Sequence, residues 1–161
     1  MQLTTATHIK PSVLGDAGTR SALLDAINRG PAIVDYVGHG NANIWRGNTL
    51  TSADAAGLRN EDRPTVFVSL TCLNGYFPDP ATDSLAEALM RSGAGGAVAV
   101  WASSAMTLAD AQATMAQEFY RGVFARRASL GDAALRAKAL TGDADVRRSW
   151  ILFGDPTMKL K

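Results

Sequence analysis

The stretch Thr65-Val66-Phe67-Val68-Ser69-Leu70-Thr71-Cys72 decides the fold. Its continuous apolar character, rich in β-branched residues, predicts a strand that is buried on both faces, as in a parallel sheet covered by helices. The strand ends at Cys72, the only cysteine of the chain. Because one thiol cannot pair within the chain, Cys72 is either a core residue or a chemically active one.

A second apolar run, Pro31 to Val37, leads into Gly38-His39-Gly40. Further strands are expected over 96–101 and 150–153 and weakly over 2–9, a loop over 41–48, and helices over 19–30, 51–57, 84–93, 109–124 and 130–140. Strands alternating with helices predict an α/β fold with a mostly parallel sheet and helices on both faces. In such sheets active groups gather at the carboxyl ends of the strands, where His39 and Cys72 both lie.

Composition indicates an ordinary globular domain, with 47% hydrophobic, 19% charged and 7% aromatic residues. We expect one domain over residues 1–161, since this length suffices for a sizeable core. Sixteen basic and fifteen acidic residues leave a net charge of +1, which gives no basic footprint for nucleic acid or an anionic membrane surface. No apolar stretch approaches the roughly 20 residues of a membrane helix.

A nucleophilic role for Cys72 requires a partner, because a free thiol has a pKa of about 8.5 and is mostly protonated at neutral pH. His39 is the candidate base; the other histidine, His8, lies in a weakly patterned stretch. The backbone N–H groups of Gly40 and Cys72 could form an oxyanion hole. Asp35 lies four residues before His39 on the same strand, too far to touch the imidazole, and is expected to be a buried, hydrogen-bonded residue near a sheet edge. One histidine and one cysteine do not make a tetrahedral zinc site.

Several motifs in order resemble the gingipain family of cysteine peptidases, and they span about residues 21–160. They are Tyr36-Val37-Gly38-His39-Gly40-Asn41 with Trp45, Thr71-Cys72-Leu73-Asn74-Gly75-Tyr76-Phe77, Ser84 to Met90, Gly96 to Val100 with Ser103-Ser104, and Leu152-Phe153-Gly154-Asp155-Pro156. The resemblance implies a caspase-like fold, a Cys72–His39 catalytic dyad, an oxyanion hole at Gly40 and Cys72, and endopeptidase activity on peptide or protein substrates.

The same resemblance implies that this chain is the C-terminal, catalytic part of a larger protein. Family members have strands upstream of the histidine strand, and only about 38 residues precede His39 here. The missing N-terminal part would be a partner in the same protein. A secreted or cell-surface bacterial location is implied, with the signal peptide outside this chain. No cofactor is required, and calcium enters only through the resemblance, because no calcium-binding loop motif occurs.

Candidate substrate-binding residues are Trp45, Asp79, Ser103 and Ser104. Trp45 has two interpretations, lining the substrate cleft or pinning the loop after His39. Asp79 could read a basic side chain through charge-assisted bonds, as the family preference implies, or could be a turn residue between two prolines. The segment after Ser104 lacks the tryptophan that family members can supply to the pocket, so a smaller or apolar residue at the cleaved position is admissible.

A different class of function also fits the sequence. The chain could be a non-catalytic peptidase-like module used in binding or assembly, or an isolated part that is inactive alone. Reaction with a thiol reagent distinguishes the two hypotheses, because a thiolate at Cys72 reacts quickly below pH 7 and an ordinary thiol does not.

Overall fold

The computed structural model describes residues 6–160. Its elements, in chain order, are α1 (Pro11–Asn28), β1 (Ile33–Val37), β2 (Gly40–Asn41), β3 (Ile44–Trp45), the 3₁₀ turn η1 (Arg46–Asn48), α2 (Ser52–Ala55), β4 (Thr65–Leu70), α3 (Leu85–Arg91), β5 (Ala97–Ser103), α4 (Ala109–Tyr120), the π-helical turn η2 (Arg121–Ala125), α5 (Leu130–Leu140), α6 (Ala144–Ser149) and β6 (Trp150–Gly154).

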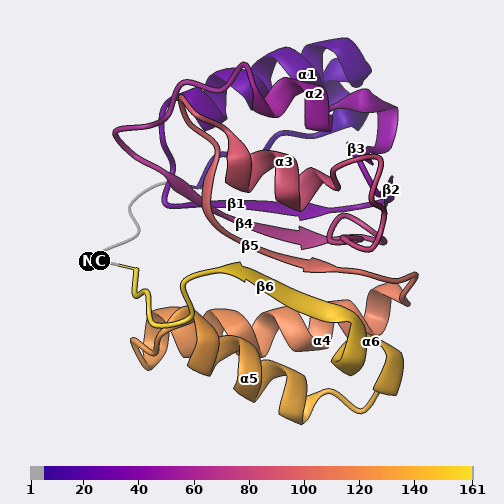
Figure 1. The fold of residues 1–161 in the computed structure, drawn as a ribbon, viewed down its shortest axis with the longest axis vertical. Coiled ribbons are helices and arrows are strands. Elements are labelled where there is room, and N and C mark those ends of the chain that lie inside the picture. The colour runs from indigo at the N-terminus through magenta and orange to yellow at the C-terminus, as the bar shows by residue number, and fades with distance from the viewer. Residues whose placement is uncertain (1–5, 161) are drawn as a thin grey trace.

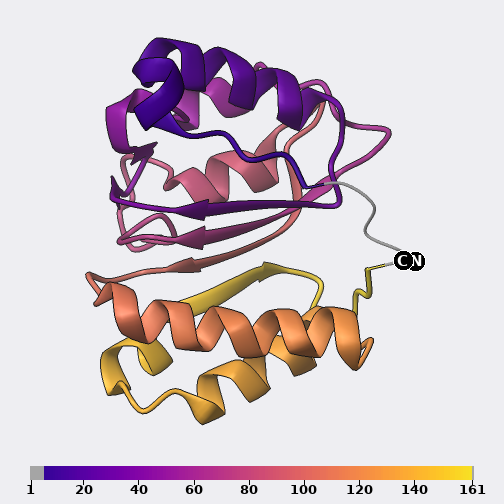
Figure 2. The same ribbon diagram turned by 180° about the vertical axis from the view of Figure 1, so that it is seen from behind.

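The main sheet has four strands in the order β1-β4-β5-β6. The pairs β1·β4 and β4·β5 are parallel, and β6 runs antiparallel to β5. Helices α1, α2 and α3 cover one face, and α4, α5 and α6 cover the other (Figures 1 and 2). The predicted α/β architecture, a mostly parallel sheet with helices on both faces, is therefore confirmed.

β4 is the centre of the core, since all six of its residues are buried. Its side chains alternate between the two faces, with Val66 and Val68 packed in the cluster under α4 and α5, and Phe67 in the cluster under the other helices. Trp101 on β5 and Trp150 on β6 are fully buried in the first of these clusters. Apolar residues on both faces of a strand require helices on both faces, which is how β4 fixes the layered fold.

Short polar signals start the small helices where the sequence placed them. Thr51 precedes α2 and forms a capping box with Asp54, and Ser84 does the same with Glu87 in α3. Each hydroxyl accepts a backbone N–H of the first turn while the acidic side chain reaches back to the cap. These caps fix the two short helices that pack against each other beside β4.

The structure differs from the sequence prediction at several elements. α1 begins at Pro11 instead of Thr19, because proline is favoured in a first helical turn. Gly15, with φ of 65°, separates this first turn from the rest of the helix. Residues 41–48 were expected to be a loop and contain the β2–β3 hairpin and η1. α6 was not predicted. Of the weak strand expected over 2–9, residues 2–5 lie outside the described part and 6–9 have no regular structure.

None of the helices within residues 6–160 combines the length and the apolar composition that a membrane crossing requires.

Candidate active site

His39 and Cys72 leave the sheet side by side. The last register pair of β1 and β4 is Val37 with Leu70, and the N–H of Gly38 donates to the carbonyl of Leu70 at 3.3 Å. Each candidate lies two positions beyond its strand's last paired residue. Neighbouring strands are about 4.8 Å apart, so the two backbones emerge together at the carboxyl edge of the sheet, the side toward which the arrows of β1, β4 and β5 point (Figure 1).

The two loops touch through Gly40 and Thr71. A Cβ atom at Gly40 would lie 2.8 Å from the Thr71 Oγ1 and 2.8 Å from the Ile44 carbonyl oxygen. Any other residue would push the hairpin away from the residue that precedes Cys72. The glycine next to His39 is therefore required by close packing between the histidine loop and the cysteine loop.

Cys72 is half-buried at the start of a constrained loop. Its Sγ lies 3.7 Å from the carbonyl oxygen of Thr107, in the loop after β5. The next residue, Leu73, has φ of 62°, a left-handed conformation that costs about 1–2 kcal/mol for a residue with a side chain. Backbone bonds from Leu73 N–H to Ala105 and from Gly75 N–H to Ser103 hold the loop in place, at 3.2 and 2.9 Å. Strain of this kind at a candidate nucleophile is typical of functional sites.

The backbone of His39 is also fixed. Its carbonyl oxygen accepts hydrogen bonds from the Tyr36 hydroxyl at 2.7 Å and from the Arg46 N–H at 2.8 Å. The histidine residue itself is exposed. A rigid backbone beneath an accessible imidazole suits a group that must meet both a thiol and a substrate.

Trp45 is buried and holds the hairpin. Its ring stacks on Tyr36 with centroids 4.1 Å apart, and its indole N–H donates to the Asn74 Oδ1 at 2.7 Å. With 1% of its surface exposed, the side chain offers no face to a substrate. The cleft-lining interpretation of Trp45 is corrected by this burial, and its alternative, an aromatic residue that pins the loop, agrees with the contacts. The burial of Asn74 between two loops could not be predicted from the sequence, because its partners lie about 30 residues away.

The other substrate-binding candidates have structural contacts. The Asp79 carboxylate accepts hydrogen bonds from the Thr82 hydroxyl at 2.6 Å and the Ala81 N–H at 2.9 Å, and these bonds lower its pKa. This is the turn interpretation of Asp79. Ser103 is fully buried, and its hydroxyl contacts the Ser149 Oγ at 3.1 Å, so the predicted substrate contact is corrected. The half-buried Ser104 donates to the Ser149 carbonyl at 3.0 Å. Both serines anchor the end of α6 to β5.

Asp35 accepts a hydrogen bond of 2.7 Å from the Tyr120 hydroxyl at the end of α4. It is hydrogen-bonded and lies near a sheet edge as predicted, but the expected burial is wrong: Asp35 is exposed, because β1 is an edge strand of the described sheet. Partial desolvation of the carboxylate raises the pKa of Asp35, and the hydrogen bond from Tyr120 opposes this effect without outweighing it. Its contact with α4 agrees with the expectation that it does not reach His39.

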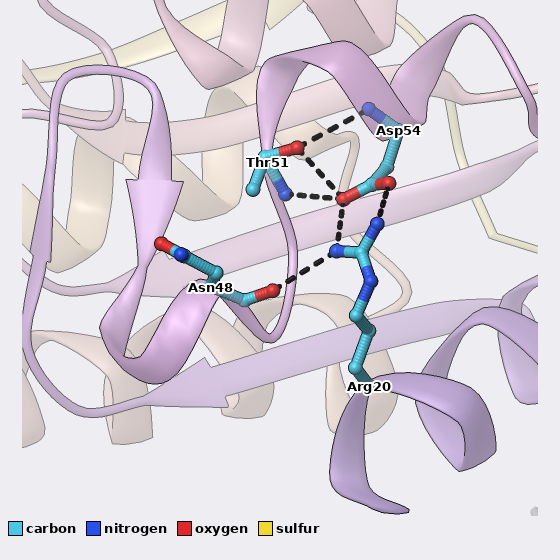
Figure 3. Close-up of polar contacts among 4 residues, drawn as sticks. All are labelled: Arg20, Asn48, Thr51 and Asp54. Carbon is cyan, nitrogen blue, oxygen red and sulfur yellow. Dashed lines mark hydrogen bonds and ion pairs between the residues drawn. The ribbon is translucent and has the colours of Figure 1, made fainter. Parts of the chain in front are cut away.

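An ion pair supports the far side of the hairpin (Figure 3). The guanidinium of Arg20, on α1, forms a forked pair with the Asp54 carboxylate and donates to the Asn48 carbonyl at 2.9 Å. The same carboxylate accepts from the Thr51 N–H and hydroxyl, each at 2.8 Å. One carboxylate therefore links α1 to α2, and the guanidinium adds the turn that follows the hairpin.

We expect the Asp54→Asn substitution to lower the free energy of unfolding by about 1–3 kcal/mol at pH 7, because it removes the negative charge and one of the two oxygens that accept from Arg20 and Thr51. Burial alone would raise the pKa of Asp54, but the bonds from Arg20 and Thr51 outweigh it and the pKa is lowered. A lowered carboxyl pKa stabilises the fold above the unfolded value of about 3.9, and the contribution is lost as pH falls through the folded pKa.

Urea unfolding at pH 7 and pH 3 measures this effect, with Asp62→Asn in an exposed loop as the control. The difference between wild type and Asp54→Asn should shrink at pH 3. A difference that is the same at both pH values would contradict the ion-pair account.

Residues 6–160 contain no group of three or more His, Cys, Asp or Glu side chains arranged to hold a metal ion.

Comparison with solved structures finds similar folds in three structures that are described as proteases. Gingipain R (RgpB), described as an Arg-specific cysteine proteinase, superposes with a TM-score of 0.81 at 22% identity, covering 88% of this chain and 36% of that chain. A complex of RgpB pro- and mature domains from Porphyromonas gingivalis gives 0.79 at 22% identity, covering 88% and 37%. A third structure, described as a protease, gives 0.70 at 16% identity, covering 84% and 36%.

These likenesses confirm the caspase-like fold that the resemblance implied, and this chain spans little more than a third of the chains that it matches. A comparison with curated proteins gave no match. The model of peptidase family C25 matches residues 3–161, nearly the whole sequence. The chain belongs to peptidase family C25, the gingipain family of cysteine peptidases.

Proposed function

We propose that this chain is the catalytic part of a larger cysteine endopeptidase in which Cys72 is the nucleophile and His39 its base. The observation that carries the proposal is the matched register of β1 and β4, which brings both residues out of the sheet at equivalent positions. The left-handed Leu73 and the tight contact between Gly40 and Thr71 support it, because they constrain both loops. A location outside the cell or at its surface, and catalysis without a cofactor, are part of the same proposal.

The proposed reaction is acyl transfer through sulfur. His39 takes the proton of the Cys72 thiol, and the thiolate attacks the peptide carbonyl carbon to form a tetrahedral oxyanion. The N–H groups of Gly40 and Cys72 stabilise that oxyanion. His39 then protonates the leaving amine, the C–N bond breaks, and water hydrolyses the resulting thioester to release the acid and restore the thiol.

Exposed apolar side chains near the strand ends suit an extended peptide substrate. They lie at the end of β1, in the loop after Cys72 and in the loop after β5, and they are Val37, Tyr76, Phe77, Met106 and Leu108, with 71%, 39%, 52%, 76% and 73% of their surfaces exposed. Exposed apolar residues at the carboxyl edge of a sheet are available to contact a substrate bound there. We propose these side chains, in place of the buried Trp45 and Ser103, as contacts for the substrate.

The test is the pH dependence of iodoacetamide alkylation at Cys72 in the full-length protein, measured by mass spectrometry of the peptide that contains it. If His39 holds a thiolate, alkylation should already be fast below pH 7. In His39→Ala the midpoint should rise toward about 8.5, the value of a free thiol.

His8→Ala is the matched control, because His8 is the only other histidine and is exposed outside any regular element. Its alkylation profile should equal that of the wild type. A wild-type midpoint near 8.5 that does not respond to His39→Ala would reject the dyad and favour the non-catalytic module.

A further inference from the structure

Asn74 joins the cysteine loop to the hairpin that follows His39. It lies two residues after Cys72 and is 1% exposed. Its side-chain oxygen accepts the Trp45 indole N–H at 2.7 Å, and its side-chain nitrogen donates to the Asn41 carbonyl at 2.6 Å and the Ile44 carbonyl at 3.4 Å. One buried amide therefore bonds to both strands of the hairpin.

The backbone of Asn74 adds a contact on another element. Its carbonyl oxygen accepts the N–H of Ala86 in the first turn of α3 at 2.9 Å. The adjacent Leu85 N–H donates to the carbonyl of Ala42 at 2.7 Å, in the turn of the same hairpin. The first two residues of α3 therefore bond to both the cysteine loop and the hairpin after His39.

From the hairpin the connection continues to His39. Trp45, held by Asn74, stacks on Tyr36, and the Tyr36 hydroxyl donates to the His39 carbonyl. The N–H of Arg46, next to Trp45, donates to the same carbonyl. A displacement of Trp45 therefore changes two of the contacts that fix the backbone of His39.

We propose that Asn74 is a positioning residue, which sets the relative placement of Cys72 and His39 through the hairpin. This inference rests on the proposed function. A misplacement of about 1 Å between reacting groups can cost about 100-fold in rate. Removal of the amide should therefore reduce the turnover number more than the Michaelis constant, since the substrate contacts proposed above are other residues.

Asn60 provides a matched control. It is also a buried asparagine, 3% exposed, and its side chain bonds to the Gly96 carbonyl at 2.9 Å and accepts the Gly96 N–H at 2.7 Å. Asn60 lies in the loop before β4 and contacts Gly96, the residue before β5. Both residues are at the amino ends of the strands, whereas Cys72 lies beyond the carboxyl end of β4. Asn60→Ala removes a comparable set of bonds without touching either loop of the site.

The experiment compares Asn74→Ala, Trp45→Phe and Asn60→Ala in the full-length protein, with kcat and KM for peptide hydrolysis and the alkylation profile of Cys72. We expect Asn74→Ala to lower kcat by about 10- to 100-fold with KM within about threefold, and to raise the alkylation midpoint. Trp45→Phe, which keeps an aromatic ring beside Tyr36 but removes the N–H donor and part of the buried indole volume, should lower kcat by about 3- to 10-fold. Asn60→Ala should keep kcat within about twofold of wild type.

Equal kcat values for wild type and Asn74→Ala, or equal losses in Asn74→Ala and Asn60→Ala, would overturn the positioning role. If Asn74→Ala does not fold, Trp45→Phe decides by the same criteria. Failure of the proposed function looks different, because the wild-type thiol would then alkylate as an ordinary one and Cys72→Ala would retain full hydrolysis. That outcome would remove the positioning role as well.

Discussion

Replacing Cys72, the proposed nucleophile, with alanine should reduce peptide hydrolysis by the full-length protein by about 10⁴-fold or more, because an enzyme without its nucleophile keeps only binding and oxyanion stabilisation. The substitution should affect the reaction and leave the fold intact. The side chain is small and half-buried, so its loss opens little core volume. The free energy of unfolding should change by less than about 1.5 kcal/mol.

Hydrolysis of a protein substrate and equilibrium unfolding, measured on the same preparation, separate the two effects. His8→Ala serves as the control for a substitution far from the site, since its residue is exposed and outside the sheet. Retention of wild-type hydrolysis by Cys72→Ala would show that another group carries the reaction.

Replacing Trp101 with alanine should lower the free energy of unfolding by about 3–5 kcal/mol, a large part of the stability of a typical domain. Its side chain is fully buried, stacks on Phe119 at 4.2 Å between ring centroids and meets Trp150 edge-on at 6.0 Å. Alanine removes both aromatic contacts and leaves a cavity between β5 and α4 that the helix cannot fill without moving.

Urea unfolding followed by far-ultraviolet circular dichroism measures this loss. Leu135→Ala on α5 is the control, because 70% of that leucine is exposed and its truncation should change stability by no more than about 0.5 kcal/mol. If Trp101→Ala and Leu135→Ala cost the same, the core assigned to this face of the sheet would be wrong.

The sequence was most informative where an apolar run or a helix-start pattern is compatible with one kind of local structure. The apolar run of β4 had to be covered on both faces, and the run before His39 had to form a neighbouring parallel strand, so the carboxyl-edge position of both candidates followed. The helices expected from residues 51 and 84 begin there, and the structure shows that Thr51 and Ser84 cap them. These predictions depended on local chemistry and on general rules of α/β topology.

Predictions failed where structure depended on distant contacts. The strands β2 and β3 have two residues each, too few for an alternation pattern, and they form because Gly40 packs on Thr71 and Asn74 bonds to the hairpin. α6 is six residues long and is stabilised by the Asp143 cap and by Ser103. The burial of Trp45 could not be read from a loop composition, because its partner lies 29 residues away.

The left-handed backbone at Leu73 has a consequence for engineering this domain. The left-handed conformation carries a steric cost for leucine, which has a Cβ atom, and glycine would adopt it without that cost. A Leu73→Gly substitution would remove this cost from the folded state. Glycine would also give the unfolded chain more conformational freedom, which lowers the stability of the folded state. At Leu73 the relief of strain in the folded chain and the added entropy of the unfolded chain therefore change the stability in opposite directions.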